Sequence, residues 1–241
     1  MTDETIPRRK FLLGAGLAGT AVATGLTGAP PAQAQNLATE VTAAASSARN
    51  AQPLLLLNES EHAFVVAAVD TMIPADELSP SGSACGVAVF IDRQLASAWG
   101  GGAKLYRAGP YFKGKPEQGY QLSLSPAEFI TAGIAAANNW SRKSYGKDFD
   151  QLEPDKRIEA LKAMEEGKAE FVNFNSRVFF ARLYALTMEG FFSDPIYGGN
   201  RDMASWRMLG FPGLPAKYAD LVEEYRDKRY VPEPHSIADF S

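Results

Sequence analysis

The segment that most constrains the fold runs from Phe171 to Gly190 and is almost continuously apolar. Its apolar side chains do not alternate with a period of two, so the segment predicts a helix rather than a strand. A helix that is apolar on every side is expected to be buried. We therefore expect an all-α fold, an irregular helical bundle around a central apolar helix over about residues 171–190, with long loops rich in Gly, Pro and aromatic residues.

Helix-start patterns predict two more helices. Asn58 and Glu61 have the spacing of a capping box, which predicts a helix from there to about Met72. Ser125, followed by a proline and then by Glu128, predicts another helix that ends near residue 143.

Apolar residues at helical spacing predict a helix over residues 86–98, with Asp92 and Arg93 facing outward, and another that begins at Pro154 and turns Ile158 inward. Residues 103–124 combine aromatic side chains with Gly, Pro and Lys, which predicts an irregular arm and a candidate contact for a partner. We assign residues 56–230 to a single helical domain and residues 231–241 to a Pro-containing tail.

The segment from Gly190 to Gly213, which follows the apolar helix, holds five Gly, two Pro and five aromatic residues. Linkers are polar and flexible, so a loop this aromatic either packs on its own core or meets a partner. Its Gly-Gly-Asn run favours positive φ, suited to a turn or to anion binding by exposed amides, and we favour the turn. Because aromatic residues are typical of binding hot spots, we predict a partner interface formed by Phe192, Asp194, Pro195, Tyr197, Gly198, Gly199, Asn200, Trp206 and Phe211.

Charged residues near this loop predict an anchor for it. Arg182 and Glu189 are seven positions apart, on one face of the predicted helix, and buried charges must be paired. Asp194, Arg201 and Asp202 in the loop are natural partners. We therefore favour structural salt bridges that involve Arg182, Glu189 and Arg201 over a catalytic role.

The first thirty-four residues have the pattern of an export signal. Arg8 and Arg9 precede an uncharged apolar run, and Ala32 and Ala34 form a small-x-small cleavage pattern, so residues 1–34 are identified as a twin-arginine signal peptide. A GxGxxG match inside the apolar run lacks the preceding strand that a dinucleotide site needs. Residues 35–55 are predicted to be a flexible lead-in, because most of them are small or polar.

Composition argues against several classes of function. The formal net charge is −4, and removal of residues 1–34, which carry three basic and two acidic residues, leaves −5. No basic stripe remains, so nucleic acid is not expected as a partner. The sequence contains no CxxCH motif for covalent haem, and we predict no catalytic, cofactor-binding or metal-binding residue on this chain.

Three residues with reactive side chains have simpler structural explanations. His62 has no base partner or nucleophile nearby in sequence, so a solvated residue at a helix start is favoured over a general base. His235 lies in the Pro-containing tail and is similarly unpromising. Cys85 precedes a predicted helix, and a buried small residue is favoured over a reactive or inter-chain thiol.

At the aromatic loop the sequence resembles the gluconate 2-dehydrogenase subunit 3 family, the small subunit of membrane-bound, FAD-dependent gluconate or sugar dehydrogenases. The resemblance is carried by Arg8-Arg9, by Met72 to Asp76, by Phe192 to Asn200, and by Trp206 with Gly210 to Gly213. It spans essentially the whole chain after the signal peptide.

The resemblance implies a non-catalytic role in an oxidoreductase complex. In that family a large subunit carries FAD and oxidises the substrate, and a multi-haem c-type cytochrome subunit accepts the electrons. The small subunit binds the large subunit and carries it through the twin-arginine translocase. The expected location is the periplasm, peripheral to the inner membrane through the complex. This agrees with a folded-export signal on a chain without a cofactor motif.

Two other functions remain open from the residues alone. One is a free-standing periplasmic enzyme with an unrecognised site near Arg182, Glu189 and Asp194. The other is a stand-alone ligand-binding module that uses the 190–213 loop. A closed pocket beneath Tyr197 and Trp206 would favour the module, whereas an exposed apolar surface there would favour a partner interface.

Overall fold

The computed structural model describes residues 53–241 except 113, 116–121, 173–174, 215–216 and 241. Pro53–Ser241 form one compact unit. The predicted signal peptide, with Arg8, Arg9, Ala32 and Ala34, lies outside the described residues, as does the lead-in up to residue 52. Among the described residues no helix is both long and apolar enough to cross a bilayer.

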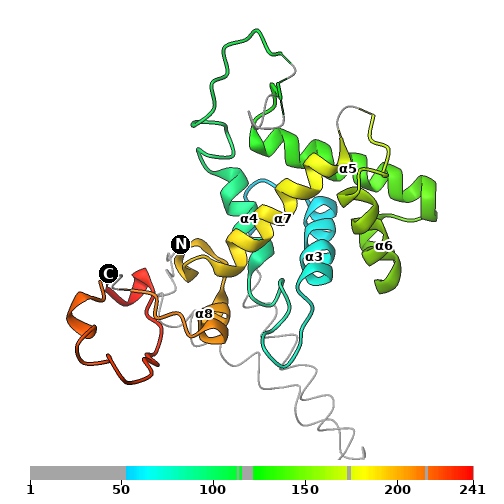
Figure 1. Ribbon diagram of the computed structural model, residues 1–241. Helices are drawn as coiled ribbons and strands as arrows, with labels where there is room; N and C mark the ends of the chain where they lie inside the picture. The colour runs from blue at the N-terminus through cyan, green and yellow to red at the C-terminus, as the bar shows by residue number, and fades with distance from the viewer. Residues whose placement is uncertain (1–52, 113, 116–121, 173–174, 215–216, 241) are drawn as a thin grey trace, which may run out of the picture. The chain divides into compact units, whose positions relative to one another are not determined.

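The described residues are helical and contain no β-strand, which confirms the all-α prediction (Figure 1). The α-helices are α3 (Glu59–Met72), α4 (Val87–Ala96), α5 (Pro126–Tyr145), α6 (Pro154–Glu165), α7 (Ser176–Phe192) and α8 (Ala204–Leu209). Short 3-10 turns are η2 (Phe149–Gln151), η3 (Pro195–Tyr197), η4 (Arg201–Met203), η5 (Ala219–Leu221) and η6 (Ile237–Phe240).

The predicted capping box of Asn58 and Glu61 is present, and Ser125 and Glu128 form a second one at the other predicted helix start. The Asn58 side chain accepts a hydrogen bond from the Glu61 amide, and the Glu61 carboxylate accepts one from the Asn58 amide, each at 2.9 Å. Ser125 and Glu128 exchange the same pair of bonds at the start of α5. These local bonds satisfy amides that the first turn of a helix leaves unpaired, which is why the two starts are readable in the sequence.

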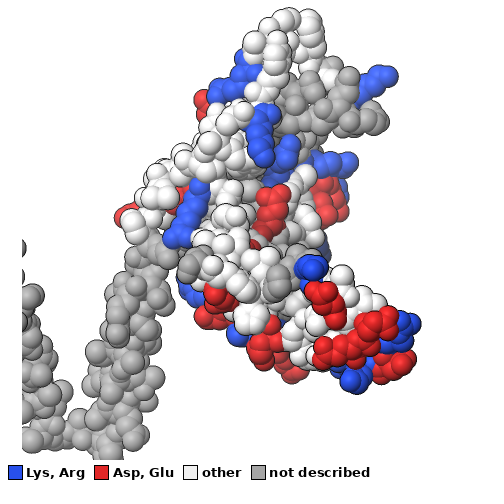
Figure 2. Space-filling view, turned by 90° about the vertical axis from the view of Figure 1, so that its left-hand side faces the viewer, with Lys and Arg blue, Asp and Glu red and all other residues white. Residues whose placement is uncertain are grey.

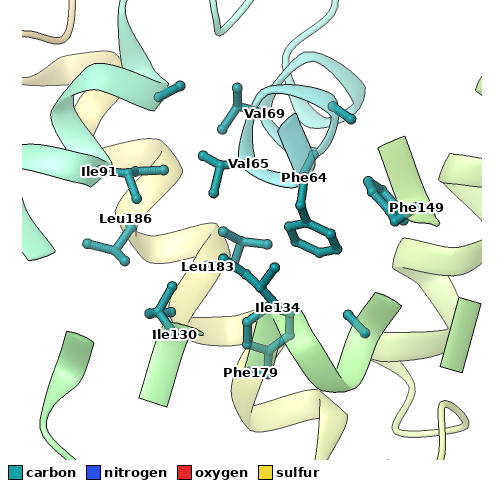
Figure 3. Close-up of a cluster of buried hydrophobic side chains, with 14 of the residues drawn as sticks. Phe64, Val65, Val69, Ile91, Ile130, Ile134, Phe149, Phe179, Leu183 and Leu186 are labelled. Carbon is teal, nitrogen blue, oxygen red and sulfur yellow. The ribbon is translucent and has the colours of Figure 1, made fainter. Parts of the chain in front are cut away.

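The hydrophobic core lies where α3, α4, α5 and α7 meet (Figure 3). Phe64 and Val65 of α3 face Ile134 of α5 and Leu183 of α7 across it, and the ring centroids of Phe64 and Phe149 are 4.8 Å apart. Gly133 lets α5 and α7 approach closely, because a Cβ atom there would lie 2.0 Å from the ring of Phe179. Close approach of this kind gives the core its packing density.

Helix α7 begins five residues later than predicted and ends two residues later, and it contacts α4, α5, α6 and α8. The prediction that this helix is buried on every side is wrong, because Val178, Arg182 and Tyr184 are exposed. The buried side chains of α7 form one stripe instead, which includes Phe179, Leu183 and Leu186. On α6, Ile158 is also exposed, whereas Leu161 and Met164 are buried.

Asp92 is buried rather than outward-facing, with 3% of its surface exposed. Its carboxylate accepts hydrogen bonds from the amides of Leu55, Leu56 and Leu57 at 2.6, 3.0 and 2.8 Å. A carboxylate that accepts several amide bonds can be buried at low cost. The segment just before α3, which includes the last residue of the predicted lead-in, is therefore fixed to α4.

We expect Asp92→Ala to lower the free energy of unfolding by about 2–4 kcal/mol, because it leaves three amides without their acceptor. Asp92→Asn retains one acceptor oxygen and should lose less. Urea unfolding followed by the helical circular dichroism signal measures both variants, with the exposed Asp227→Ala as the control. A loss for Asp92→Ala no larger than that of the control would contradict this role.

Candidate functional site

The predicted loop folds into a compact series of short turns after α7, formed by η3, η4 and α8 (Figure 1). Asn200 lies at its centre and has no solvent exposure. Its Nδ2 group donates to the Ser193 carbonyl at 2.9 Å, and its Oδ1 atom accepts from the amide and the hydroxyl of Ser205 at 3.0 and 2.8 Å. One side chain thus joins the start of the loop to α8.

Glycine residues let this loop lie directly against α7 and the start of α4. A Cβ atom at Gly199 would lie 2.1 Å from the carbonyl oxygen of Gly190. A Cβ atom at Gly86 would lie 2.3 Å from the carbonyl oxygen of Gly198. The Arg201 amide also donates to the Cys85 carbonyl at 2.9 Å. Backbone contacts this close exclude larger residues, so the Gly-Gly-Asn run serves the turn that we favoured.

The backbone of the loop holds three non-glycine residues with positive φ, namely Asn200 at 43°, Asp202 at 56° and Met203 at 54°. Asn and Asp tolerate this left-handed region, but Met does so at a cost of about 1–2 kcal/mol. Such conformations persist only where surrounding contacts fix them. The loop is therefore a fixed structure and not a flexible linker.

Trp206 is buried, with 7% of its surface exposed, and its indole N–H donates to the Phe192 carbonyl at 2.9 Å. Its ring packs edge-on against Phe211, with centroids 5.2 Å apart. The backbone of Gly213 lies directly against the Trp206 ring, because a Cβ atom at Gly213 would lie 2.7 Å from that ring. The tryptophan thus acts as an internal support that holds Phe211 in place.

The C-terminal tail returns to this loop, which the sequence did not indicate. Gly213 pairs with His235 in an isolated parallel bridge. The Asp194 carboxylate accepts hydrogen bonds from the amides of Ile196 and Ile237 at 3.0 and 2.8 Å. One acidic side chain therefore caps η3 and fixes η6, and the tail is part of the site.

The predicted interface residues divide into a buried framework and an exposed set. Gly199, Asn200 and Trp206 are buried, and Phe192, Asp194, Pro195 and Gly198 are half-buried. Tyr197 and Phe211 are 49% and 44% exposed, and the neighbouring Ile196 and Leu209, which the sequence analysis did not select, are exposed as well. We call Ile196, Tyr197, Leu209 and Phe211 the loop surface. Contact with a partner stays a prediction for all of them.

The charged residues that we predicted to hold the loop are placed differently from expectation. Arg182 and Glu189 are both exposed, so the premise that they are buried is wrong, because the face of α7 that carries them is not covered. Arg201 is half-buried, and its guanidinium donates to the Ala84 carbonyl at 3.3 Å. The salt bridges themselves stay a prediction, whereas hydrogen bonds of Asn200, Trp206, Asp194 and the backbone fix the loop.

The remaining reactive side chains do not converge. His62 is half-buried at the start of α3 and His235 is exposed in the tail. Cys85 is 1% exposed, and burial raises the pKa of its thiol, as is typical of an unreactive structural cysteine. Within the part of the chain that the structure describes, no cluster of His, Cys, Asp and Glu has the arrangement of a metal site.

Fold and site together define a small helical protein that displays a rigid aromatic loop. A family model described as gluconate 2-dehydrogenase subunit 3 matches residues 59–213, a span that begins at α3 and ends with the loop. The chain belongs to the gluconate 2-dehydrogenase subunit 3 family, as the motif in its loop indicated. Comparisons with curated proteins and with solved structures find no match.

Proposed function

We propose that this chain is the non-catalytic small subunit of a periplasmic, FAD-dependent dehydrogenase complex of the gluconate 2-dehydrogenase type. Membership of a family named for a dehydrogenase subunit supports an accessory role. In this proposal the chain binds the FAD-containing large subunit and carries it through the twin-arginine translocase. A multi-haem cytochrome c subunit completes the complex at the inner membrane, and FAD and haem belong to these partners.

The observation that carries the proposal is the loop surface, where apolar side chains are exposed on a framework fixed by buried hydrogen bonds. Exposed apolar groups favour association with another surface. A rigid framework lowers the entropy that is lost when a partner binds. Aromatic residues are also common among the hot spots of interfaces. These features support a partner interface over a closed ligand pocket beneath Tyr197 and Trp206.

We expect the double variant Tyr197→Glu, Phe211→Glu to weaken binding to the large subunit by at least about tenfold, because charges then replace two exposed aromatic anchors. Binding is measured by titration calorimetry with the purified, FAD-loaded large subunit. Exposed side chains tolerate such changes, so the unfolding free energy should shift by less than about 1 kcal/mol.

The matched control is Leu78→Glu, Val172→Glu, which introduces the same charges at exposed apolar positions outside the loop. It should bind as the wild-type chain does. Equal affinity of the loop variant, the control and the wild type would show that the large subunit binds elsewhere. If the wild-type chain itself does not bind the large subunit, the proposed function is wrong.

A further inference from the structure

A small apolar cavity of about 80 Å³ lies between α5, α7 and the irregular arm that follows α4. Phe129 and Ile130 of α5 line it and are themselves buried. Pro126 of α5, Leu186 of α7 and the half-buried Trp99 and Leu105 complete the apolar lining. No residue of the 190–213 loop lines this cavity, so it is separate from the loop surface.

Two basic side chains, Lys104 and Arg182, also line the cavity, and both are exposed. Lys104 comes from the arm and Arg182 from the uncovered face of α7, so the two cations come from separate segments. An apolar floor beside two cations is suited to a group that combines an apolar side chain with nearby carboxylates.

The size of the cavity limits what can enter it. Small-molecule sites commonly measure about 300–1,000 Å³, and an apolar cavity of about 150 Å³ accepts benzene. A volume of about 80 Å³ is therefore suited to one aliphatic side chain and not to a sugar acid or a flavin. Pockets that accept a single side chain are typical of hot spots between proteins.

The net charge of the segment around the cavity also favours an acidic partner. Residues 97–125 contain four basic residues and one acidic residue, a net charge of +3, in a chain whose net charge is −4. Figure 2 shows Lys and Arg side chains prominent in the upper half of the view, where the arm lies, with some Asp and Glu side chains among them, whereas the lower half carries both signs. A positive region on a negative protein steers an acidic partner segment towards it.

The arm adds exposed apolar surface next to the cavity. Leu105 lines both this cavity and a second hollow formed by the arm itself. In that second hollow Tyr106 and Phe112 are 87% and 74% exposed. Large exposed aromatic side chains beside a cavity are the composition of a protein interface, so the arm provides area around the single anchoring side chain.

We propose that this cavity binds the large subunit through an acidic segment, which inserts one aliphatic side chain between α5 and α7 and pairs its carboxylates with Lys104 and Arg182. This rests on the proposed function and adds a second contact, distinct from the loop surface. The proposed occupant is acidic and apolar. The start of this chain, which carries Arg8, Arg9 and Lys10, does not match it and is therefore not proposed as the occupant.

The test is the charge reversal Lys104→Glu, Arg182→Glu in the full chain, with binding of the purified, FAD-loaded large subunit as the readout. We expect affinity to fall by at least about tenfold at low salt, because two attractions become repulsions. The salt dependence of the dissociation constant should also weaken or reverse. The control, Lys143→Glu, Lys162→Glu, makes the same charge change at exposed positions of α5 and α6.

A second variant, Leu105→Trp, fills the cavity from its half-buried edge without a change of charge and should also weaken binding. Hydrogen exchange of the wild-type complex should show protection at residues 99–105 and 126–130. The inference is overturned if both variants bind as the control does, or if protection is confined to the loop. Absence of binding by the wild-type chain would instead overturn the proposed function, and this inference with it.

Discussion

Replacement of Asn200 by Ala should lower the free energy of unfolding by about 3–5 kcal/mol, because two buried hydrogen bonds and one partly buried hydrogen bond are lost. The amide and the hydroxyl of Ser205 would then lack a partner in a site that water does not reach, since Asn200 and Ser205 are both fully buried. The positive φ of 43° adds to the loss, since Ala tolerates this conformation less well than Asn.

The same substitution should impair binding to the large subunit. Ile196 and Tyr197 precede Asn200, and Leu209 and Phe211 follow it, so the residue that joins the two halves also fixes the loop surface. A mobile loop must be ordered when a partner binds, and this ordering lowers affinity. We expect the variant to bind more weakly even where the chain remains folded.

Urea unfolding measures the first effect and titration with the FAD-loaded large subunit measures the second. Asn139→Ala, at an exposed position of α5, is the matched control and should change neither quantity appreciably. A stable Asn200→Ala variant, with an unfolding free energy within about 1 kcal/mol of the wild type, would show that the loop is fixed by other contacts.

Local patterns predicted the helices well because their causes are local. A capping box satisfies backbone groups within one turn, so Asn58 with Glu61 and Ser125 with Glu128 identify helix starts without any knowledge of the fold. Pro154, at the first position of α6, is equally local. The loop motif was found for a related reason, since Asn200 and three of the loop's glycines, Gly198, Gly210 and Gly213, adopt the positive φ that their types favour.

Charged residues were harder to place because their surroundings depend on distant parts of the chain. Asp92 looks like an outward residue on α4, but its partners are amides 35 to 37 residues earlier. Arg182 and Glu189 look like buried charges in an apolar run, but the fold leaves that face of α7 uncovered. Periodicity shows which residues share a face of a helix. It does not show which of those faces another element will cover.

The contact of the tail with the loop had no signal in the sequence. The hydrogen bond from the Ile237 amide to Asp194 joins residues 43 positions apart. Every residue except proline has a backbone amide, so the identity of residue 237 does not reveal this donor. The cavity between α5 and α7 is equally non-local, because its lining comes from separate segments. Sites assembled from distant residues need the fold before they can be recognised.

The second large effect concerns export. Replacement of Arg8 and Arg9 by Lys should abolish delivery of the large subunit to the periplasm. Lysine retains the charge but lacks the planar guanidinium with its fork of donors, so a receptor that recognises paired arginines discriminates between the two residues. The helical domain is unchanged, so the variant should still bind the FAD-loaded large subunit, and the complex should accumulate in the cytoplasm.

Arg226→Lys, Arg229→Lys is the matched control, because it makes the same replacements at exposed positions near the C-terminal end. This control should export the large subunit as the wild-type chain does. Retention of the complex in the cytoplasm separates a failure of export from a failure of binding, since the loop variant Tyr197→Glu, Phe211→Glu should lose both.

The decisive measurement is the amount of FAD-loaded large subunit in the periplasmic fraction of cells that co-express it with each form of this chain. The wild-type chain and the Arg226, Arg229 control should deliver it, and the Arg8→Lys, Arg9→Lys form should leave the periplasmic fraction at the level of cells without this chain. Delivery at the wild-type level by the Arg8→Lys, Arg9→Lys form would contradict the export role.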